Sequence, residues 1–181
     1  MKIRKAFDTD KKNISKLHIS SIERLCSKHY THEQLNAWTS VLIPSVYDQA
    51  LKEKIFLVAH DSNQYLIGFG ILDIQNAEIS AIYIHPDAVR NGIGTELLCK
   101  LEEIARNSDV IKISVHSTLN AKGFYQRHGY LDHGLTFHLL SNGSKLECVR
   151  MFKNCNRSLQ HTELIQEKRP RCPIESRLHE L

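Results

Sequence analysis

The spacing of apolar residues changes along this chain and predicts where strands and helices alternate. Short runs rich in β-branched and aromatic residues, bounded by turn residues, are typical of strands. In the run at residues 110–116, Ile111, Ile113 and Val115 alternate with polar residues, so one face of this strand is expected to be buried. Seven runs are expected to form strands, at residues 2–7, 55–60, 65–73, 78–84, 110–116, 131–140 and 145–152.

A spacing of three or four residues predicts helices between these strands. The first helix is expected to begin near Asp10 and to reach Leu25. Thr31 and Gln34 resemble a capping box at the start of the second helix, and Gly129 is expected to be the C-cap of the last one. The later helices are expected at residues 31–39, 45–52, 94–107 and 120–128. Strands and helices interleaved in this way predict an α/β domain with a mixed sheet.

Length, charge and composition narrow the class of protein. The 181 residues are enough for one domain with a sizeable core. The 24 basic and 20 acidic residues are scattered, so nucleic acid is not an expected partner. Because no run approaches eighteen apolar residues and the first residues lack the apolar core of a signal peptide, we expect no membrane association and a cytoplasmic location.

The regular apolar spacing ends near residue 153. We therefore expect a folded domain at residues 1–153 and a tail at residues 154–181 that lies outside the core, with one helical segment near residues 159–168. The final hairpin, whose Asn142-Gly143 pair is a strong turn signal, and this tail both offer surfaces for a homodimer.

The stretch from Glu78 to Leu98 combines a strand, a loop that contains glycine, and a helix. The helical spacing of apolar residues begins at Ile93, so the helix must start at or just after Gly92-Ile93-Gly94. At a helix start the backbone N–H groups lack partners within the helix, the dipole favours an anion, and glycine lets the anion approach closely. We therefore predict that this loop binds a pyrophosphate.

Two motifs, each on the expected element, resemble the signatures of the GNAT superfamily of N-acetyltransferases, and the resemblance covers residues 2–153. The acetyl-CoA signature, Arg or Gln, two residues, Gly, one residue, and Gly or Ala, falls on residues 89–94, where Val89 stands in place of Arg or Gln. The second signature is the segment with Phe124, Tyr125, Gly129 and Tyr130. The resemblance implies a mostly antiparallel GNAT-type sheet of about seven strands, flanked by helices and splayed between the fourth and fifth strands.

The resemblance also implies acetyl-CoA as the cosubstrate. The pyrophosphate would lie on the glycine loop, and the pantetheine arm would enter the gap between the splayed strands. A backbone N–H of the fourth strand would face the thioester oxygen. The coenzyme contacts implied in this way are Ile82, Tyr83, Ile84, Val89, Arg90, Asn91, Gly92, Ile93, Gly94, Thr95, Asn120 and Phe124.

Acetyl transfer to an amine needs a base for the ammonium proton and an acid for the departing thiolate. Tyr125 is the candidate general acid, and core packing is its alternative role. Glu78 is the candidate general base, directly or through water, and in an ideal strand it shares a face with Ile82 and Ile84. His116 is the alternative base because its ordinary pKa is closer to neutral. A water chain without a single base is a third option.

The acceptor and any metal are less well defined. Tyr30 and Trp38 precede the second strand and are candidates for a wall of the substrate pocket, although core packing explains them about as well. Cys26, His29 and His32 lie three residues apart, but no second cluster completes a set of four zinc ligands, so no metal is expected.

We therefore predict an enzyme that transfers acetyl directly to a primary amine of a small molecule or a protein within a ternary complex, since no cysteine sits where it could be acylated first. The alternative, favoured by Val89, is a catalytically weak acyl-CoA-binding regulatory module of the same fold. A third class is an interaction protein that works through the tail.

Overall fold

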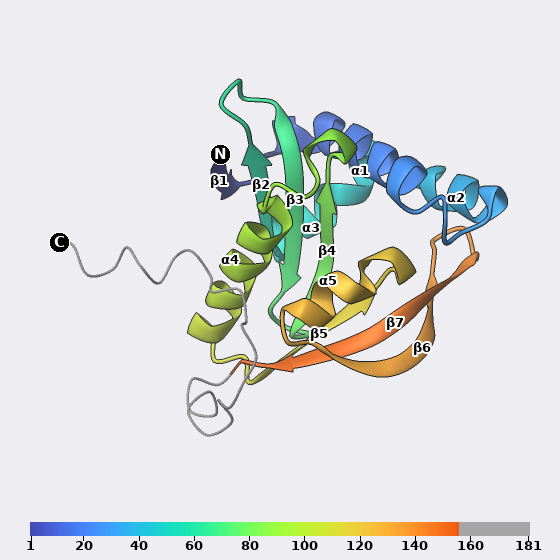
Figure 1. Cartoon of the computed structure of the whole chain (residues 1–181). Helices are drawn as coiled ribbons and strands as arrows, with labels where there is room; N and C mark the ends of the chain where they lie inside the picture. Colours follow the sequence, from blue (N-terminus) through green and yellow to red (C-terminus); the bar gives the residue numbers. More distant parts are fainter. Residues whose placement is uncertain (156–181) are drawn as a thin grey trace.

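A computed structural model describes residues 1–155 of the chain. Seven strands form one sheet in the order β1-β2-β3-β4-β5-β7-β6 (Figure 1). Every neighbouring pair is antiparallel except β4 and β5, which are parallel. The predicted mixed, mostly antiparallel sheet is therefore confirmed. The strands are β1 (Lys2–Lys5), β2 (Ile55–His60), β3 (Leu66–Asp73), β4 (Glu78–Ile84), β5 (Lys112–Ser117), β6 (Leu131–Leu139) and β7 (Lys145–Asn154).

Helices cover both faces of this sheet. Figure 1 shows α4 and α5 on one face and α1, α2 and α3 on the other. Among the described residues, no helix is both long enough and apolar enough to cross a membrane. The α-helices are α1 (Lys11–Leu25), α2 (His32–Thr39), α3 (Asp48–Glu53), α4 (Ile93–Asn107) and α5 (Lys122–Arg127), and the 3-10 turns are η1 (Asp8–Asp10), η2 (Pro44–Tyr47), η3 (Pro86–Ala88) and η4 (Leu119–Ala121).

The helix ends follow the predicted capping chemistry. At the start of α2 the Gln34 N–H donates to the Thr31 hydroxyl at 3.2 Å, and the Thr31 N–H donates to the Gln34 side chain at 2.9 Å. Gly129 follows α5 with φ of +84°, a left-handed conformation that glycine adopts without a Cβ clash. The predicted helix at residues 120–128 is divided into η4 and α5.

Two layers of apolar side chains hold the helices to the sheet. On the α4 face, Leu97, Leu98 and Leu101 are fully buried and pack with Ile113 and Val115 of β5. On the α1 face, a separate cluster joins α1 to β2 and β3. Burial of each large apolar side chain stabilises the fold by about 1.5–3 kcal/mol.

Two expectations from the apolar pattern need correction, and the expectations for the tail stay untested. Ile111 is 67% exposed and precedes β5, so only the later residues of that run, Ile113 and Val115, have the predicted burial. Tyr65, expected at the start of β3, is 70% exposed and lies in the turn before it. The predicted helical segment at residues 159–168 and the tail beyond residue 155 lie outside the described residues.

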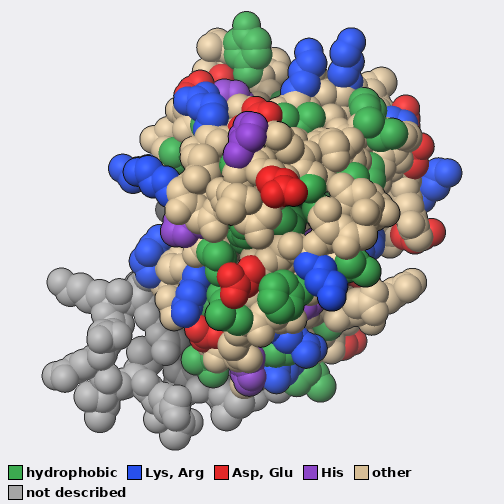
Figure 2. Space-filling view, turned by 90° about the vertical axis from the view of Figure 1, so that its right-hand side faces the viewer, with side chains coloured by type: hydrophobic (Ala, Val, Ile, Leu, Met, Phe, Trp, Pro, Cys, Tyr) green, Lys and Arg blue, Asp and Glu red, His purple; other side chains and the backbone are tan. Residues whose placement is uncertain are grey.

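The sheet opens between β4 and β5. These strands pair at Glu78 with Ser114 and at Ile79 with Val115, and β4 then continues to Ile84 without β5 beside it. The predicted splay is therefore confirmed. Figure 2 shows the side of the molecule that carries α2 and the β6–β7 hairpin, where acidic, basic and histidine side chains are interspersed.

The register between β3 and β4 shifts where the gap begins. Ile71 pairs with Ala81, whereas Leu72 pairs with Ile79, so Ser80 has no counterpart on β3 and forms a bulge. Because a bulge adds one residue to the strand, each residue before it lies on the face opposite to the one that regular alternation would give. This bulge decides which face of the sheet each candidate site residue of β4 occupies.

Candidate active site

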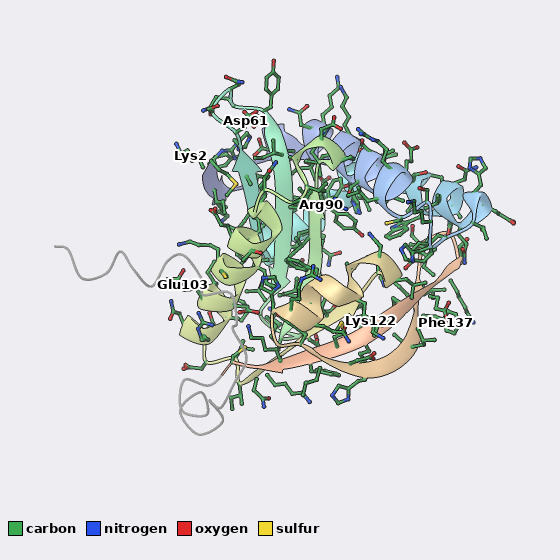
Figure 3. The ribbon with its side chains drawn as sticks, viewed as in Figure 1. Lys2, Asp61, Arg90, Glu103, Lys122 and Phe137 are labelled. Atoms are coloured by element: carbon green, nitrogen blue, oxygen red, sulfur yellow. The ribbon has the colours of Figure 1, made fainter. Side chains whose placement is uncertain are left out.

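The glycine loop lies at the end of β4, on the way to α4. Arg90 has φ of +65° and Gly92 has φ of +80°, and these two left-handed residues turn the chain into the helix. Arg90, Asn91 and Gly92 are exposed, whereas Val89 is half-buried. Figure 3 labels Arg90 in this loop and Lys122 at the start of α5.

The first turn of α4 presents unpaired donors next to this loop. Its first hydrogen bond runs from the Glu96 N–H to the Gly92 carbonyl at 3.0 Å, so the N–H groups of Ile93, Gly94 and Thr95 have no partner inside the helix. Such a turn favours an anion through its donors and its dipole. The sequence-based hypothesis of a pyrophosphate site therefore has suitable local geometry here.

β4 offers its backbone to the gap beyond the bulge. Ile82, Tyr83 and Ile84 pair with β3 on one side, and β5 has already diverged from them on the other. Ile82 and Ile84 contact the cluster beneath α4, whereas Tyr83 contacts the clusters beneath α1 and α2. The backbone side that faces the gap can therefore pair with an extended ligand.

Tyr125 lies on the α4 face of the sheet, in the same cluster as the buried residues of α4. Its side chain is only 4% exposed, and its ring packs edge-on against Tyr130 at 5.3 Å. Burial, helped by the charge of Glu102, raises the pKa of Tyr125 above its usual value. The phenol therefore keeps its proton at neutral pH, as a proton donor must.

Glu78 and His116 lie together at the point where the gap begins. The Glu78 carboxylate (Oε1) is 3.6 Å from His116 Nδ1, and both side chains are about one-third exposed, at 30% and 33%. Both residues are on the α1 face, because His116 alternates with the buried Val115, whose side chain packs on the α4 face. The expectation that Glu78 shares a face with Ile82 and Ile84 is therefore wrong, and the bulge at Ser80 is the cause.

His138 on β6 belongs to the same cluster and was missed in the sequence. Partial burial and the charge of His116 lower the pKa of His138, and Glu78 acts in the opposite direction. His138 sits in an edge strand about twenty residues after His116, and no local spacing links the two. The strand order β5-β7-β6, which places the two histidines in one sheet, was the missing information.

Tyr30 and Trp38, the predicted pocket residues, are buried in the cluster that joins α1, α2 and the last hairpin. The Tyr30 hydroxyl donates to the Glu147 carbonyl at 2.7 Å and accepts from the Leu119 N–H at 3.1 Å. Its hydrogen bonds therefore tie the segment between α1 and α2 to β7 and η4. Burial raises the pKa of Tyr30 to about 12. The Trp38 ring packs edge-on against Tyr30 at 5.7 Å and also lies near Tyr83.

Asn120, expected at the pantetheine arm, accepts a hydrogen bond from the Cys26 thiol, with 3.5 Å between sulfur and oxygen. Burial raises the pKa of Cys26 to about 12, although the bond to Asn120 acts in the opposite direction. This thiol is therefore protonated at neutral pH and is a poor nucleophile. Within residues 1–155, no group of three or more His, Cys, Asp or Glu side chains is placed to hold a metal ion.

Comparison with known proteins identifies one family that matches this chain. The family model described as an acetyltransferase (GNAT) domain matches residues 26–146. A solved GCN5-related N-acetyltransferase from Rhodopseudomonas palustris has 27% identity and a TM-score of 0.79, over 84% of this chain and 94% of that chain. No curated protein sequence matches this chain.

Two further solved structures share the fold and contain the coenzyme. The PaiA N-acetyltransferase from Thermoplasma acidophilum, solved with coenzyme A, has 21% identity and a TM-score of 0.64, over 84% of this chain and 98% of that chain. A phosphinothricin acetyltransferase of the GNAT superfamily from Sinorhizobium meliloti, solved with AcCoA, has 16% identity and a TM-score of 0.60, over 84% of this chain and 87% of that chain.

Proposed function

The chain belongs to the acetyltransferase (GNAT) family, and from this premise we propose that it transfers the acetyl group of acetyl-CoA to a primary amine of a small molecule or a protein. The observation that carries the proposal is the gap between β4 and β5, with unpaired helix donors at one end and Tyr125 beside it. The acceptor class, a homodimer, the cytoplasmic location and the domain boundary at residue 153 stay predictions from the sequence.

The residues present suit the coenzyme. Its pyrophosphate would accept hydrogen bonds from the N–H groups of Ile93, Gly94 and Thr95, beside the exposed Arg90. Its pantetheine arm would pair with the backbone of Ile82–84 in the gap. The bound coenzyme supplies a thioester whose carbonyl carbon is open to attack by an amine.

The protein's own groups can handle the protons of this reaction. Glu78, with His116 at 3.6 Å, would accept a proton from the acceptor's ammonium group, directly or through water, and the neutral amine would then attack the thioester carbon. Tyr125 would donate a proton to the departing thiolate sulfur. We favour direct attack of the amine in a ternary complex, because the Cys26 thiol is buried and hydrogen-bonded to Asn120 and is therefore a poor candidate for an acyl-cysteine intermediate.

The experiment measures free thiol released from acetyl-CoA with a panel of amines. We expect Tyr125→Phe and Glu78→Gln each to lower kcat by about 10²- to 10⁴-fold with little change in coenzyme affinity. The matched controls are Tyr65→Phe and Glu23→Gln, which alter exposed residues and should leave kcat unchanged. If Tyr125→Phe has the kcat of the wild type, Tyr125 is a packing residue.

A second candidate is a weakly active acyl-CoA-binding module. It is favoured by Val89, which stands where the family signature has Arg or Gln and which offers no side-chain donor to a phosphate. Tight coenzyme binding without thiol release for any amine would support this candidate over the enzyme. A Val89→Arg variant that gains affinity but no turnover would strengthen the same conclusion.

A further inference from the structure

We propose that His128 is a positioning residue for the coenzyme's phosphates, acting through Thr95. This role rests on the proposed function and goes beyond it, because His128 touches neither the gap nor the loop backbone directly. Its contacts join α5, which carries Tyr125, to the first turn of α4, which carries the unpaired N–H donors.

The hydrogen bonds of His128 have an assignable direction. Nδ1 lies 2.8 Å from the Phe124 carbonyl oxygen, which can only accept, so Nδ1 carries a proton. In the neutral ring Nε2 is then an acceptor, and it lies 3.1 Å from the Thr95 hydroxyl oxygen. The Thr95 hydroxyl therefore donates a hydrogen bond to His128 Nε2.

A second contact, made by Phe124 of α5, supports the adjacent residue of α4, Gly94. The Phe124 ring packs at a tilt against the His128 ring, with 4.5 Å between the ring centroids. A Cβ placed on Gly94 would lie 3.4 Å from the Phe124 ring, so this ring lies directly against the backbone of α4. Phe124, on α5, thus supports Gly94, and His128, the residue that follows α5, supports Thr95.

This support fixes the donors that the phosphate needs. The N–H groups of Gly94 and Thr95 have no partner in the helix, and the first turn of a helix frays easily without tertiary contacts. The His128–Thr95 bond holds the Thr95 side chain and, through it, the backbone of this turn. Donors that are already in place bind an anion without a further ordering cost.

Other contacts hold β4 in place along the gap. The start of β4 is fixed by its pairing with β5 at Glu78 and Ile79, and the rest of β4 by its pairing with β3. The pantetheine arm would therefore keep its binding surface if the His128 contact were lost. Loss of the His128 contact should therefore weaken the binding only of a ligand that has phosphates.

The test compares acetyl-CoA with S-acetylpantetheine, which has the same thioester but no phosphate. We expect His128→Asn, which keeps the Nδ1-type donor and loses the Thr95 contact, to raise the KM for acetyl-CoA about fivefold, the factor that one ordinary hydrogen bond represents. The kcat at saturation and the KM for S-acetylpantetheine should stay unchanged. His128→Gln, whose amide reaches the Nε2 position, should restore part of the affinity.

The controls separate the possible outcomes. His29→Asn makes the same change at an exposed histidine and should alter neither constant. Thr95→Val should match His128→Asn, and the double variant should be no worse than either one. An equal loss with both thioesters, or no loss with acetyl-CoA, would overturn the role of His128. A wild-type protein that binds neither thioester would overturn the proposed function itself, and this role with it.

Discussion

His18 makes the stability of the fold dependent on pH in a way that can be isolated. It lies on α1, is 8% exposed, and its ring lies 3.8 Å from the Tyr83 ring. Nδ1 is hydrogen-bonded to the Tyr47 hydroxyl at 3.0 Å, whereas Nε2 has no hydrogen-bond partner among the described residues. Burial lowers the pKa of His18 from 6.5 to about 3.

The sign follows from the two pKa values. In the unfolded chain His18 binds a proton below pH 6.5, whereas in the folded protein it stays neutral until pH falls to about 3. The free energy of unfolding therefore decreases as pH falls through this window. At pH 5, about 1.5 pH units below the unfolded value, the loss is about 2 kcal/mol. For a chain of this size this corresponds to a decrease in Tm of roughly 4–8 °C.

Urea unfolding at pH 7 and pH 5 measures the effect, in the wild type and in His18→Gln. The variant is expected to be less stable at both pH values, so the informative quantity is the decrease between them, which should be smaller in the variant by about 2 kcal/mol. Other histidines contribute equally to both proteins and cancel. His29→Gln, at an exposed position, should behave as the wild type does. The same decrease in His18→Gln and in the wild type would refute the assigned pKa.

Two further predictions concern the glycine loop and the ion pair between Lys153 and Glu102. Gly92→Ala should destabilise the protein by about 1 kcal/mol and weaken coenzyme binding, because φ is +80° there while the added Cβ meets no atom within 4 Å; chemical denaturation and isothermal titration measure the two effects. Lys153→Met should cost about 1–3 kcal/mol, because Lys153 Nζ lies 2.6 Å from the buried Glu102 carboxylate while Arg106, at 4.0 Å, remains a second partner of that carboxylate. Lys145→Met on the same strand is the control, and equal stability of the two variants would contradict this.

The apolar spacing predicted the elements well because most of them bury one regular face. α4 is the clearest case, since Leu97, Leu98 and Leu101 recur at helical spacing and all three are fully buried. The pattern failed at Ile111, because the alternation of apolar residues begins before the first residue of β5 and includes this exposed residue. Alternation gives the period of a strand but not the residue at which its neighbours begin to pair.

The candidate site was less predictable because it depends on contacts between distant segments. Local motifs gave the glycine loop and Tyr125, since each motif lies on one element. His138 was missed because it lies about twenty residues after His116 on another strand, and no local spacing links the two. His128 was visible within its motif, but its partner Thr95 lies 33 residues away on another helix.

The bulge at Ser80 connects the fold to the proposed chemistry. Without the extra residue, Glu78 would share the α4 face with Ile82 and Ile84, which contact the apolar cluster beneath α4. With the bulge, Glu78 lies beside His116 on the α1 face, while Tyr125 stays on the α4 face. The proposed base and the proposed acid therefore lie on opposite faces, and they can serve one reaction only through the gap between β4 and β5. The proposed roles imply that the acceptor amine enters from the α1 side and the coenzyme from the α4 side, and that the two meet at the thioester.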